Sequence, residues 1–409
     1  MNILQAHKYY FPRDGASRYM VELSNSLQQL KHTVVPFTVA MPQTLSSPYS
    51  RFFVRDMDIQ DPAALSWSQK IRFGAKIIYS LEAKQKIHSL LADTQIDVAH
   101  IHNIYHHISP SILGALKQRK IPIVMTLHDY KLVSPNYALF HHGQIHEEDA
   151  SGWYTSCVKN KCVKDSRSAS ALSTLEMILH HKFFRFYERY VDRFIAPSQF
   201  MIDLCVRHSW PREKFVHLPN PTNTDREFLS EEGKYVTYIG RLSEEKGLSV
   251  LLDAAKRTPA IPYRLVGEGP QKKYLKQKIQ SQNIKNVELI GFQSGAKLEQ
   301  EFSKARLLVL PAVWYENNPL SVLEAKARGR VVVASSIGGL SEMLPRELLV
   351  PPQDSTTLAK TLEKWYSASI SEREKMGKKL QKDVQKKNNS NEHVQKVLQV
   401  YHDVIKDKR

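Results

Sequence analysis

Short apolar runs of strand length alternate with amphipathic helical stretches along almost the whole chain, and this alternation occurs twice. The runs lack the alternating polar positions of half-exposed strands, so they are typical of strands buried on both faces. Parallel sheets with helices on both faces have this pattern. The sequence therefore predicts an α/β protein with two doubly wound domains. Strands are expected at NILQA, HTVVPFTVA, DVAHIHN, IPIVMTLHD and RFIAPS, and then at KYVTYIGR, YRLVGEG, VELIGF, RLLVLPAV and RVVVASS.

A break between the two repeats falls at residues 217–225, where Pro219 and Pro221 interrupt the pattern. The length of 409 residues also exceeds what one hydrophobic core usually organises. We therefore predict a first domain at 1–217, a linker at 218–225, a second domain at 226–388 and a C-terminal helix at 389–409 that packs back on the first domain. Helices are expected at residues 16–30, 109–117, 248–256, 271–280, 297–304 and 320–328.

The segment WYENNPLSVLEAKARG, residues 314–329, follows a buried-strand pattern and therefore lies where a strand end meets a helix. Asn318 is a good N-cap and Pro319 a favoured first helical residue. Helix N-termini present unpaired N–H groups that suit a phosphate. Glu316 precedes this terminus, and Glu324 lies on the helix side expected to face inward, where a carboxylate needs a partner such as a ligand hydroxyl. The alternative is that Glu316 is a solvated loop residue and Glu324 pairs with a lysine.

Two basic residues follow the first strand of the second half. Arg241 comes directly after that strand, and Lys246 stands at the start of the next helix. Both are expected at the carboxyl edge of the sheet, where ligands bind in doubly wound folds. An arginine fork and a lysine charge make a good diphosphate clamp, although an isolated pair is more often ordinary surface charge. In the first half, Gly15 opens an amphipathic helix and allows a ligand to approach the backbone closely.

Taken together, YIGRLSEEKG, LVGEGP and ENNPLSVLEAKARGRVVVASSIGGLSEML resemble the donor half of glycosyltransferase family 4. These enzymes are retaining, depend on nucleotide sugars and have the GT-B fold, in which two Rossmann-like domains face each other across a cleft. Glu316 and Glu324 match the spacing of the family's E-x7-E signature. TLHDYKLVSPN, residues 126–136, resembles the acceptor-half motif whose histidine faces the donor sugar, which indicates His128.

The resemblance implies a role for each motif residue. Arg241 and Lys246 would hold the donor diphosphate and stabilise the leaving group. Glu316 would contact hydroxyls of the transferred sugar, and Glu324 would accept from the ribose hydroxyls. Glu316, His128, Arg241 and Lys246 would form the catalytic set. Catalysis would proceed by attack on the same face of the sugar as the leaving phosphate.

Further donor contacts would come from the backbone of Asn318, Pro319 and Leu320, and from Gly15 and Ala16 in the first domain. Relatives have a glycine pair at this last position, and the small alanine is expected to be tolerated. The resemblance implies neither a metal nor a cofactor besides the nucleotide-diphosphate sugar substrate. The implied activity is hexose transfer to a saccharide or lipid-linked acceptor, in cell-surface polysaccharide or glycolipid assembly.

The chain carries 58 Lys and Arg against 41 Asp and Glu, a formal net charge of +17, which calls for an anionic partner or surface. One alternative is a nucleic-acid-binding protein, but the basic residues are spread over both halves and no aromatic–basic stripe occurs, so no nucleic acid is expected. Another is a GT-B relative with a different reaction, such as nucleotide-sugar epimerisation. We instead expect the unassigned charge to favour contact with an anionic membrane.

Three cysteines are too few for a disulfide framework, and no signal peptide or membrane-spanning segment is apparent. The sequence therefore predicts a reduced, cytoplasmic protein, with the inner face of the cell membrane as its expected place of action. A cluster of His141, His142, His146, Cys157 and Cys162 raises the question of zinc, but zinc ligands are usually paired more tightly and a polar loop is favoured.

Other parts of the first half have less specific signals. Residues 170–194 form one aromatic and basic amphipathic pattern, read as a core helix in preference to a membrane-contacting face. His102 and His107 are less favoured candidates for residues of the acceptor pocket. The acceptor is expected to be selected by the loops at residues 46–61 and 134–156.

Overall fold

The computed structural model describes residues 1–56, 66–230 and 232–408, so residues 57–61 of the first expected acceptor loop lie outside the described part. Two six-stranded sheets, both entirely parallel, form the two halves of the molecule. The first sheet has the order β10–β9–β6–β5–β1–β2. Its strands are β1 (Asn2–Ala6), β2 (Thr33–Phe37), β5 (Val98–Ile101), β6 (Ile123–Thr126), β9 (Arg193–Ala196) and β10 (Phe215–His217).

The second sheet has the order β13–β12–β11–β14–β15–β16. Its strands are β11 (Tyr235–Ile239), β12 (Tyr263–Val266), β13 (Val287–Gly291), β14 (Ala305–Leu310), β15 (Val331–Ser335) and β16 (Leu349–Val350). Every expected strand has its counterpart in one of the two sheets, so the predicted α/β class with two doubly wound domains is confirmed. Two small pairs lie outside the sheets: β3 (Val39–Ala40) with β4 (Val54–Arg55), and β7 (Phe140–His141) with β8 (Gln144–Ile145).

Helices cover both faces of the first sheet, because consecutive strand residues point to opposite sides and both sides are apolar. Ile3, Val98 and Val124 pack with one set of helices, while Leu4, Ala99 and Met125 pack with the other. The helices of this half are α1 (Gly15–Gln29), α2 (Trp67–Ile78), α3 (Leu81–Asp93), α4 (Ser111–Gln118), α5 (Thr155–Lys159), α6 (Arg167–Met177), α7 (Phe186–Tyr190) and α8 (Gln199–Arg207).

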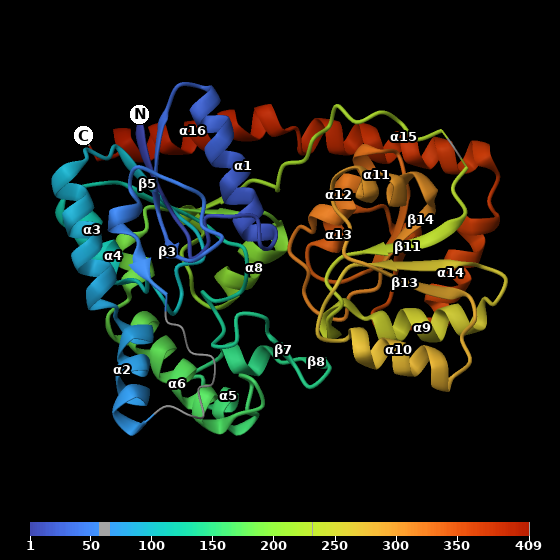
Figure 1. The fold of residues 1–409 in the computed structure, drawn as a ribbon, viewed down its shortest axis with the longest axis horizontal. Coiled ribbons are helices and arrows are strands. Elements are labelled where there is room, and N and C mark those ends of the chain that lie inside the picture. The colour runs from blue at the N-terminus through green and yellow to red at the C-terminus, as the bar shows by residue number, and fades with distance from the viewer. Residues whose placement is uncertain (57–65, 231, 409) are drawn as a thin grey trace.

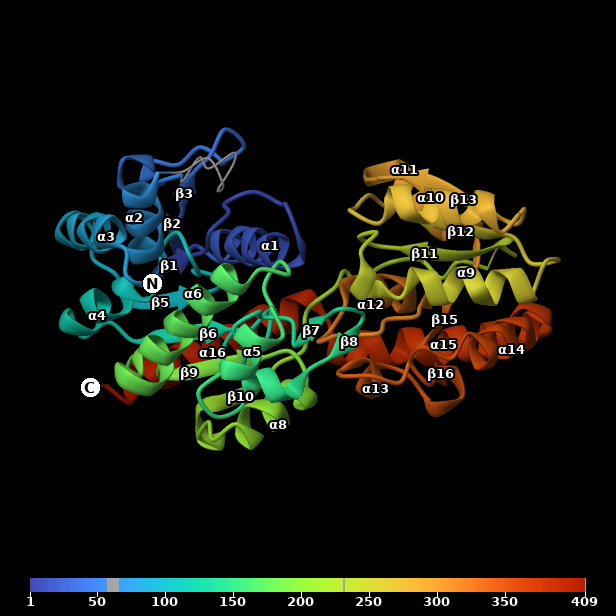
Figure 2. The ribbon, with the colours of Figure 1, turned by 90° about the horizontal axis from the view of Figure 1, so that it is seen from below.

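The second half repeats the arrangement around its own sheet (Figure 2). Within it, α9 packs against α14 and α12 against α15. The helices of this part are α9 (Leu248–Arg257), α10 (Lys272–Ser281), α11 (Gly295–Lys304), α12 (Leu320–Ala327), α13 (Leu340–Met343), α14 (Ser355–Ser367) and α15 (Ile370–Lys387), and the last helix of the chain is α16 (Ser390–Lys406).

Figure 1 shows α15 and α16 running one after the other across both domains, so that both chain termini lie in the first domain. The apolar side of α16, which includes Val397 and Val404, packs with α1 and the first sheet. The chain crosses between the domains twice, and the two crossings are bonded to each other. Asn388 donates to the Asn220 carbonyl at 2.8 Å, and Ser390 donates to the Thr222 carbonyl at 2.8 Å.

The aromatic and basic segment at 170–194 is not the single core helix that its pattern predicts. The helix α6 passes into a π-helical turn at Ile178–Phe183, and α7 begins only after Arg185, which adopts a left-handed conformation (φ 49°). This break places Tyr187 in the core and leaves Phe183 and Phe184 exposed. The amphipathic pattern is therefore shared between two helices with different contacts. Among the described residues, no helix combines the length and apolar character needed to span a bilayer.

Candidate active site

The start of α12 lies at the junction of the two domains. The helix begins at Leu320, where the helical pattern places it, and Pro319 occupies the N-cap position, with an extended ψ of 126°, instead of the first helical position. The prediction that Asn318 caps the helix is wrong, because the Asn318 side chain is used elsewhere. Its Oδ1 accepts a hydrogen bond from the Asn220 backbone N–H at 3.0 Å, and its carbonyl accepts from Asn220 Nδ2 at 2.8 Å.

Glu316 and Lys246 come together as an ion pair beside this helix start. Lys246 Nζ lies 2.5 Å from Glu316 Oε1 and 5.1 Å from the centre of the Trp314 ring. The Glu316 residue is only 4% exposed, whereas the lysine side chain is 18% exposed. Glu316 is therefore neither a solvated loop residue nor free, since its charge is balanced by the lysine expected to hold a phosphate.

Two glycines hold the backbone of the Glu316 loop close to the start of α13. Gly339 N–H donates to the Glu316 carbonyl at 2.7 Å. A Cβ on Gly339 would lie 1.8 Å from the Asn317 carbonyl oxygen, and Gly338 has a φ of +55°. Neither position tolerates a side chain without movement of the loop. The glycine pair thus fixes the position of Glu316.

Arg241 follows β11 after one intervening residue, Gly240, and its side chain is exposed. Its side chain makes no hydrogen bond or ion pair with any residue that the structure describes, whereas its backbone carbonyl accepts from Tyr238 Oη at 2.7 Å. The backbone of Arg241 is therefore fixed at the carboxyl edge of the sheet, while its guanidinium group remains available to an anion. The two residues of the predicted diphosphate clamp therefore differ: Lys246 is ion-paired with Glu316, whereas the Arg241 side chain has no partner among the described residues.

The first domain meets this site with the start of α1. The helix begins at Gly15, with Asp14 as N-cap in a reciprocal capping box with Ser17. A Cβ on Gly15 would lie 3.9 Å from Leu320 Cδ1, so the N-termini of α1 and α12 face each other across the domain junction. Ala16 lies in the same first turn and is partly buried. The structure thus brings together the first-domain and second-domain residues expected to contact the donor.

Glu324 has a partner that the sequence did not indicate. Its Oε1 lies 2.8 Å from Arg18 Nη1, and Arg18 also pairs with Glu22 on its own helix. The alternative expectation that Glu324 pairs with a lysine is thus wrong about the residue, which is an arginine, but right that Glu324 forms an ion pair. The pair links α12 to α1, so one oxygen of Glu324 is engaged by the first domain.

His128 lies at the end of β6 and is held by a second histidine. His102 Nδ1 and His128 Nε2 are 3.0 Å apart, and the two rings stack with their centres 5.3 Å apart. The ring of Tyr19 meets His128 edge-on at 5.3 Å. Burial, with a smaller contribution from the nearby His7, lowers the pKa of His128 to about 3. His128 is therefore neutral at physiological pH.

Asp129, the residue after His128, is a candidate that the sequence analysis did not single out. Its carboxylate accepts from Asn103 Nδ2 and from the Lys131 N–H, both at 3.0 Å. Burial nevertheless raises its pKa to about 6. His7 was also missed: it lies at the end of β1, and its buried Nε2 has no partner among the described residues. Both residues come directly after predicted strands, and this position is the sequence feature that could have marked them as site residues.

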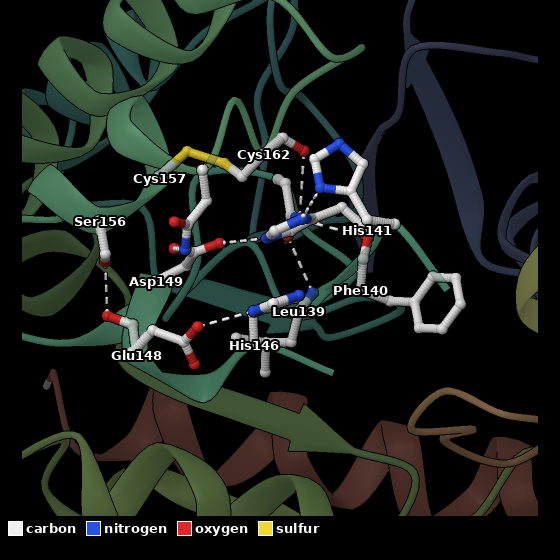
Figure 3. Close-up of polar contacts among 12 residues, drawn as sticks. Leu139, Phe140, His141, His146, Glu148, Asp149, Ser156, Cys157 and Cys162 are labelled. Carbon is white, nitrogen blue, oxygen red and sulfur yellow. Dashed lines mark hydrogen bonds and ion pairs between the residues drawn. A yellow bond between two sulfur atoms is a disulfide. The ribbon is translucent and has the colours of Figure 1, made fainter. Parts of the chain in front are cut away.

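The residues considered above as zinc ligands lie in and after the hairpin β7–β8, where they have other partners (Figure 3). Cys157 and Cys162 form a disulfide, contrary to the expectation of reduced thiols, because α5 and the turn after it bring their Cα atoms to 4.9 Å. His141 pairs with Asp149 at 2.7 Å and stacks on His146 at 3.8 Å. Within the described part of the chain, no three His, Cys, Asp or Glu side chains form a group that could hold a metal.

The same hairpin and the helical turn that follows it, Glu147–Ala150, contact the second domain. Gln353 Nε2 donates to the Gly143 carbonyl at 3.3 Å, and Tyr315 Oη donates to Glu147 at 2.6 Å. Ile145 packs against the core of the second domain. Part of the expected acceptor loop at 134–156 therefore lies against the donor half. His107, the other less favoured candidate, pairs with Asp56 at 3.2 Å and does not bond to His128.

Two family profiles match the chain. Residues 13–226 match the family described as Glycosyltransferase Family 4, which is more than half of the chain, and residues 220–383 match Glycosyl transferases group 1. The chain belongs to glycosyltransferase family 4. The motifs on which the resemblance was based therefore indicated the correct family.

Two curated relatives illustrate the extent of similarity to this glycosyltransferase. An uncharacterized 42.6 kDa protein in the cps region of Klebsiella pneumoniae is 23% identical over 359 residues, which cover 84% of this chain and 87% of that protein. The putative colanic acid biosynthesis glycosyltransferase WcaL of Escherichia coli (strain K12) is 30% identical over 137 residues, or 30% of this chain and 34% of WcaL. The second match thus covers only about a third of the relative's length.

Solved structures share the fold over the whole length of the glycosyltransferase. Sucrose-phosphate synthase from Thermosynechococcus elongatus superposes with a TM-score of 0.72 at 19% identity, covering 99% of each chain. Anabaena Alr3699/HepE, in a complex with UDP-glucose, gives a TM-score of 0.64 at 17% identity, covering 98% of this chain and 100% of HepE. The two parallel-sheet domains form a GT-B fold, as the resemblance implied.

The different surroundings of the two clamp residues predict different costs of removing them. Lys246→Ala should lower the free energy of unfolding by about 2 kcal/mol, because it leaves the buried Glu316 carboxylate without its partner. The partial exposure of the lysine keeps this cost below that of a fully buried pair. Arg241→Ala should change the free energy by no more than about 0.5 kcal/mol. Urea unfolding measures both values, and equal losses would contradict the asymmetry. As a control, adding Glu316→Gln to Lys246→Ala should recover most of the loss.

The buried histidines predict a loss of stability in acid. Burial lowers the pKa of His100 to about 3 and that of His102 well below its usual value, as it does for His128. Below about pH 6.5 the unfolded chain therefore binds protons that the folded chain does not, so stability falls as the pH falls. Asp129 acts in the opposite direction between about pH 4 and 6 because its folded pKa is raised. The three histidines outweigh Asp129, and these four groups together contribute a loss of roughly 3 kcal/mol per pH unit between about pH 5.5 and 4.5.

Urea unfolding at a series of pH values measures this dependence. The exposed His402→Gln variant is the control, and it should leave the profile unchanged. A free energy of unfolding that stays constant from pH 7 to pH 5 would contradict the prediction.

Proposed function

We propose that the protein is a retaining hexosyltransferase that moves a sugar from a nucleotide-diphosphate sugar to a saccharide or lipid-linked acceptor. The observation that carries this proposal is the unpaired Arg241 guanidinium on the loop after β11, which also carries Lys246; Lys246 pairs with Glu316 just before α12, whose N-terminus faces that of α1. Two cations and two helix N-termini are suited to a diphosphate. The complex of Anabaena HepE with UDP-glucose supports a nucleotide-sugar donor.

The proposed reaction uses groups that the site already contains. The acceptor oxygen bonds to the anomeric carbon of the sugar while the bond from that carbon to the diphosphate oxygen breaks. The acceptor proton passes to the leaving phosphate, which lies on the same face, and the configuration is retained. Arg241 and Lys246 stabilise the charge that grows on the leaving group. Glu316 holds the transferred sugar through its hydroxyls, and no metal ion is required.

The acceptor class rests on the relatives. WcaL is named for colanic acid biosynthesis, and AmsK of Erwinia amylovora, which matches 30% of this chain, for amylovoran biosynthesis. Among the solved structures, WaaB is a lipopolysaccharide outer core galactosyltransferase. These names support a role in cell-surface polysaccharide or glycolipid assembly. We expect the enzyme to act in the cytoplasm, at the inner face of the cell membrane.

Thermal unfolding in the presence of a panel of nucleotide sugars tests the donor assignment. One nucleotide sugar should stabilise the fold by about 2.7 kcal/mol at a hundredfold excess over its Kd, because only the folded state binds it. Arg241→Ala should lose this stabilisation while remaining folded. Arg257→Ala is the matched control, since Arg257 is an exposed arginine at the far end of α9. Stabilisation that is equal in both variants would remove Arg241 from the donor site.

Product analysis with the selected donor tests the reaction. Transfer with the anomeric configuration of the donor retained, at the same rate with and without EDTA, is the expected result. An inverted product, or a rate that falls on chelation and returns with a divalent ion, would contradict the mechanism. An epimerised nucleotide sugar without transfer would favour the alternative reaction.

Exposed aromatic and basic side chains of the first domain support the proposed membrane contact. Phe183 is 64% and Trp153 58% exposed, and their rings lie 6.4 Å apart. Lys182 and Arg185 flank Phe183 and Phe184 in the sequence. Aromatic rings with adjacent cations are suited to an anionic bilayer surface.

Cosedimentation with vesicles tests this contact. The protein should bind vesicles that contain anionic lipid and not neutral ones, and a variant with Phe183→Ser and Phe184→Ser should bind at least tenfold more weakly by rough estimate, since two exposed rings no longer enter the interface. Equal binding to neutral and anionic vesicles, or equal binding of the variant, would refute it.

A further inference from the structure

A chain of buried polar side chains leads from the C-terminal helix to His128. His128 Nε2 lies 3.0 Å from His102 Nδ1, and His102 Nε2 lies 2.8 Å from Gln5 Oε1. Gln5 Nε2 in turn donates to the hydroxyl of Tyr401 on α16 at 3.4 Å. The four residues come from β1, the ends of β5 and β6, and α16. A helix at the end of the chain is thereby connected to the residue expected to face the sugar.

Burial restricts the hydrogen-bond partners of His102 and Gln5 to other side chains. The His102 side chain is completely buried, and Gln5 is only 1% exposed. The Tyr401 hydroxyl has a second contact, with His100 Nδ1 at 2.6 Å, and His100 Nε2 contacts Thr126 Oγ1 at 2.7 Å. Burying a polar group without a hydrogen-bond partner costs free energy, so each donor hydrogen must point to an atom that can accept it.

The direction of the hydrogen bonds follows from the amide of Gln5. Its Oε1 only accepts, so His102 must carry its proton on Nε2. A neutral imidazole has one proton, so His102 Nδ1 is a bare acceptor, and it takes the hydrogen of His128 Nε2. His128 is itself neutral, so its Nδ1 has no proton. That nitrogen makes no hydrogen bond with any residue in the described ranges.

We infer that His102 is a positioning residue that holds His128 in the tautomer with its proton on Nε2 and leaves Nδ1 as the acceptor for substrate. The group that His128 recognises is therefore a hydrogen-bond donor, such as a hydroxyl of the transferred sugar, and not a phosphate oxygen. The assignment of His128 to the substrate rests on the proposed function, whereas the tautomer does not.

Nitrogen NMR of the full chain, labelled with ¹⁵N in histidine and without donor, tests the tautomer directly. Long-range proton–nitrogen spectra distinguish a protonated ring nitrogen from a bare one, and His128→Gln assigns the His128 signals. We expect a neutral ring with the proton on Nε2, unchanged between pH 8 and pH 6. A proton on Nδ1, or on both nitrogens, would overturn the inference. Because no sugar is involved, this result is independent of the proposed activity.

Two matched variants test the role of His102. His102→Phe keeps a ring but removes both hydrogen bonds, and the His128 tautomer should become mixed. His100→Phe is the control, because His100 is equally buried and bonded to the same Tyr401, yet does not bond to His128. With this control His128 should keep its proton on Nε2. An unchanged His128 tautomer in His102→Phe would overturn the inference, and should that variant not fold, the wild-type spectrum still decides it.

Kinetics separate positioning from a general loss of stability. With the donor identified by the panel, His102→Phe should lower kcat by at least about tenfold and leave the affinity for UDP within about twofold, whereas His100→Phe should keep its kcat within about threefold. A purely structural role would lower kcat equally in the two variants, and that result would overturn the assignment of His102.

Discussion

The side chains of Asn317 and Asn318 hold the start of α12 against the first domain, and the geometry of the whole site depends on them. Asn318 is bonded twice to Asn220 of the linker, and Asn317 accepts from Ser198 Oγ at 2.6 Å and donates to the Leu127 carbonyl at 3.4 Å. Amides that are buried without partners cost free energy, so these bonds fix the loop. The carboxylate next to them, Glu316, is thereby placed opposite the end of β6.

The contacts around this loop make the donor and acceptor halves one site. Arg18 reaches Glu324 from α1, and Tyr315 reaches Glu147 in the turn after the first-domain hairpin. The two chain crossings are bonded to each other, and α16 returns to the first domain. A glycosyltransferase of this fold must orient two substrates on separate domains, and these contacts set the relative position of the groups that would hold them.

Much of the fold and part of the site were predictable because they depend on local signals. The expected strands in the middle of each sheet are apolar on both faces, and burial on both faces is what a central parallel strand requires. Lys246 and Glu316 were expected at neighbouring strand ends, and the structure pairs them at 2.5 Å. The N-cap of α12 was misplaced by one residue because Asn318 bonds to Asn220, 98 residues away in the chain.

The sequence by itself determined the two parallel-sheet domains, the family and the strand ends that carry the site, because hydrophobic periodicity and motif spacing are properties of neighbouring residues. Only the tertiary structure decided the partners: Arg18 for Glu324, His102 for His128, Cys157 for Cys162, and Tyr401 for Gln5. Most of these pairs join segments far apart in the chain. Their geometry depends on how helices and domains pack, and no local pattern records that packing.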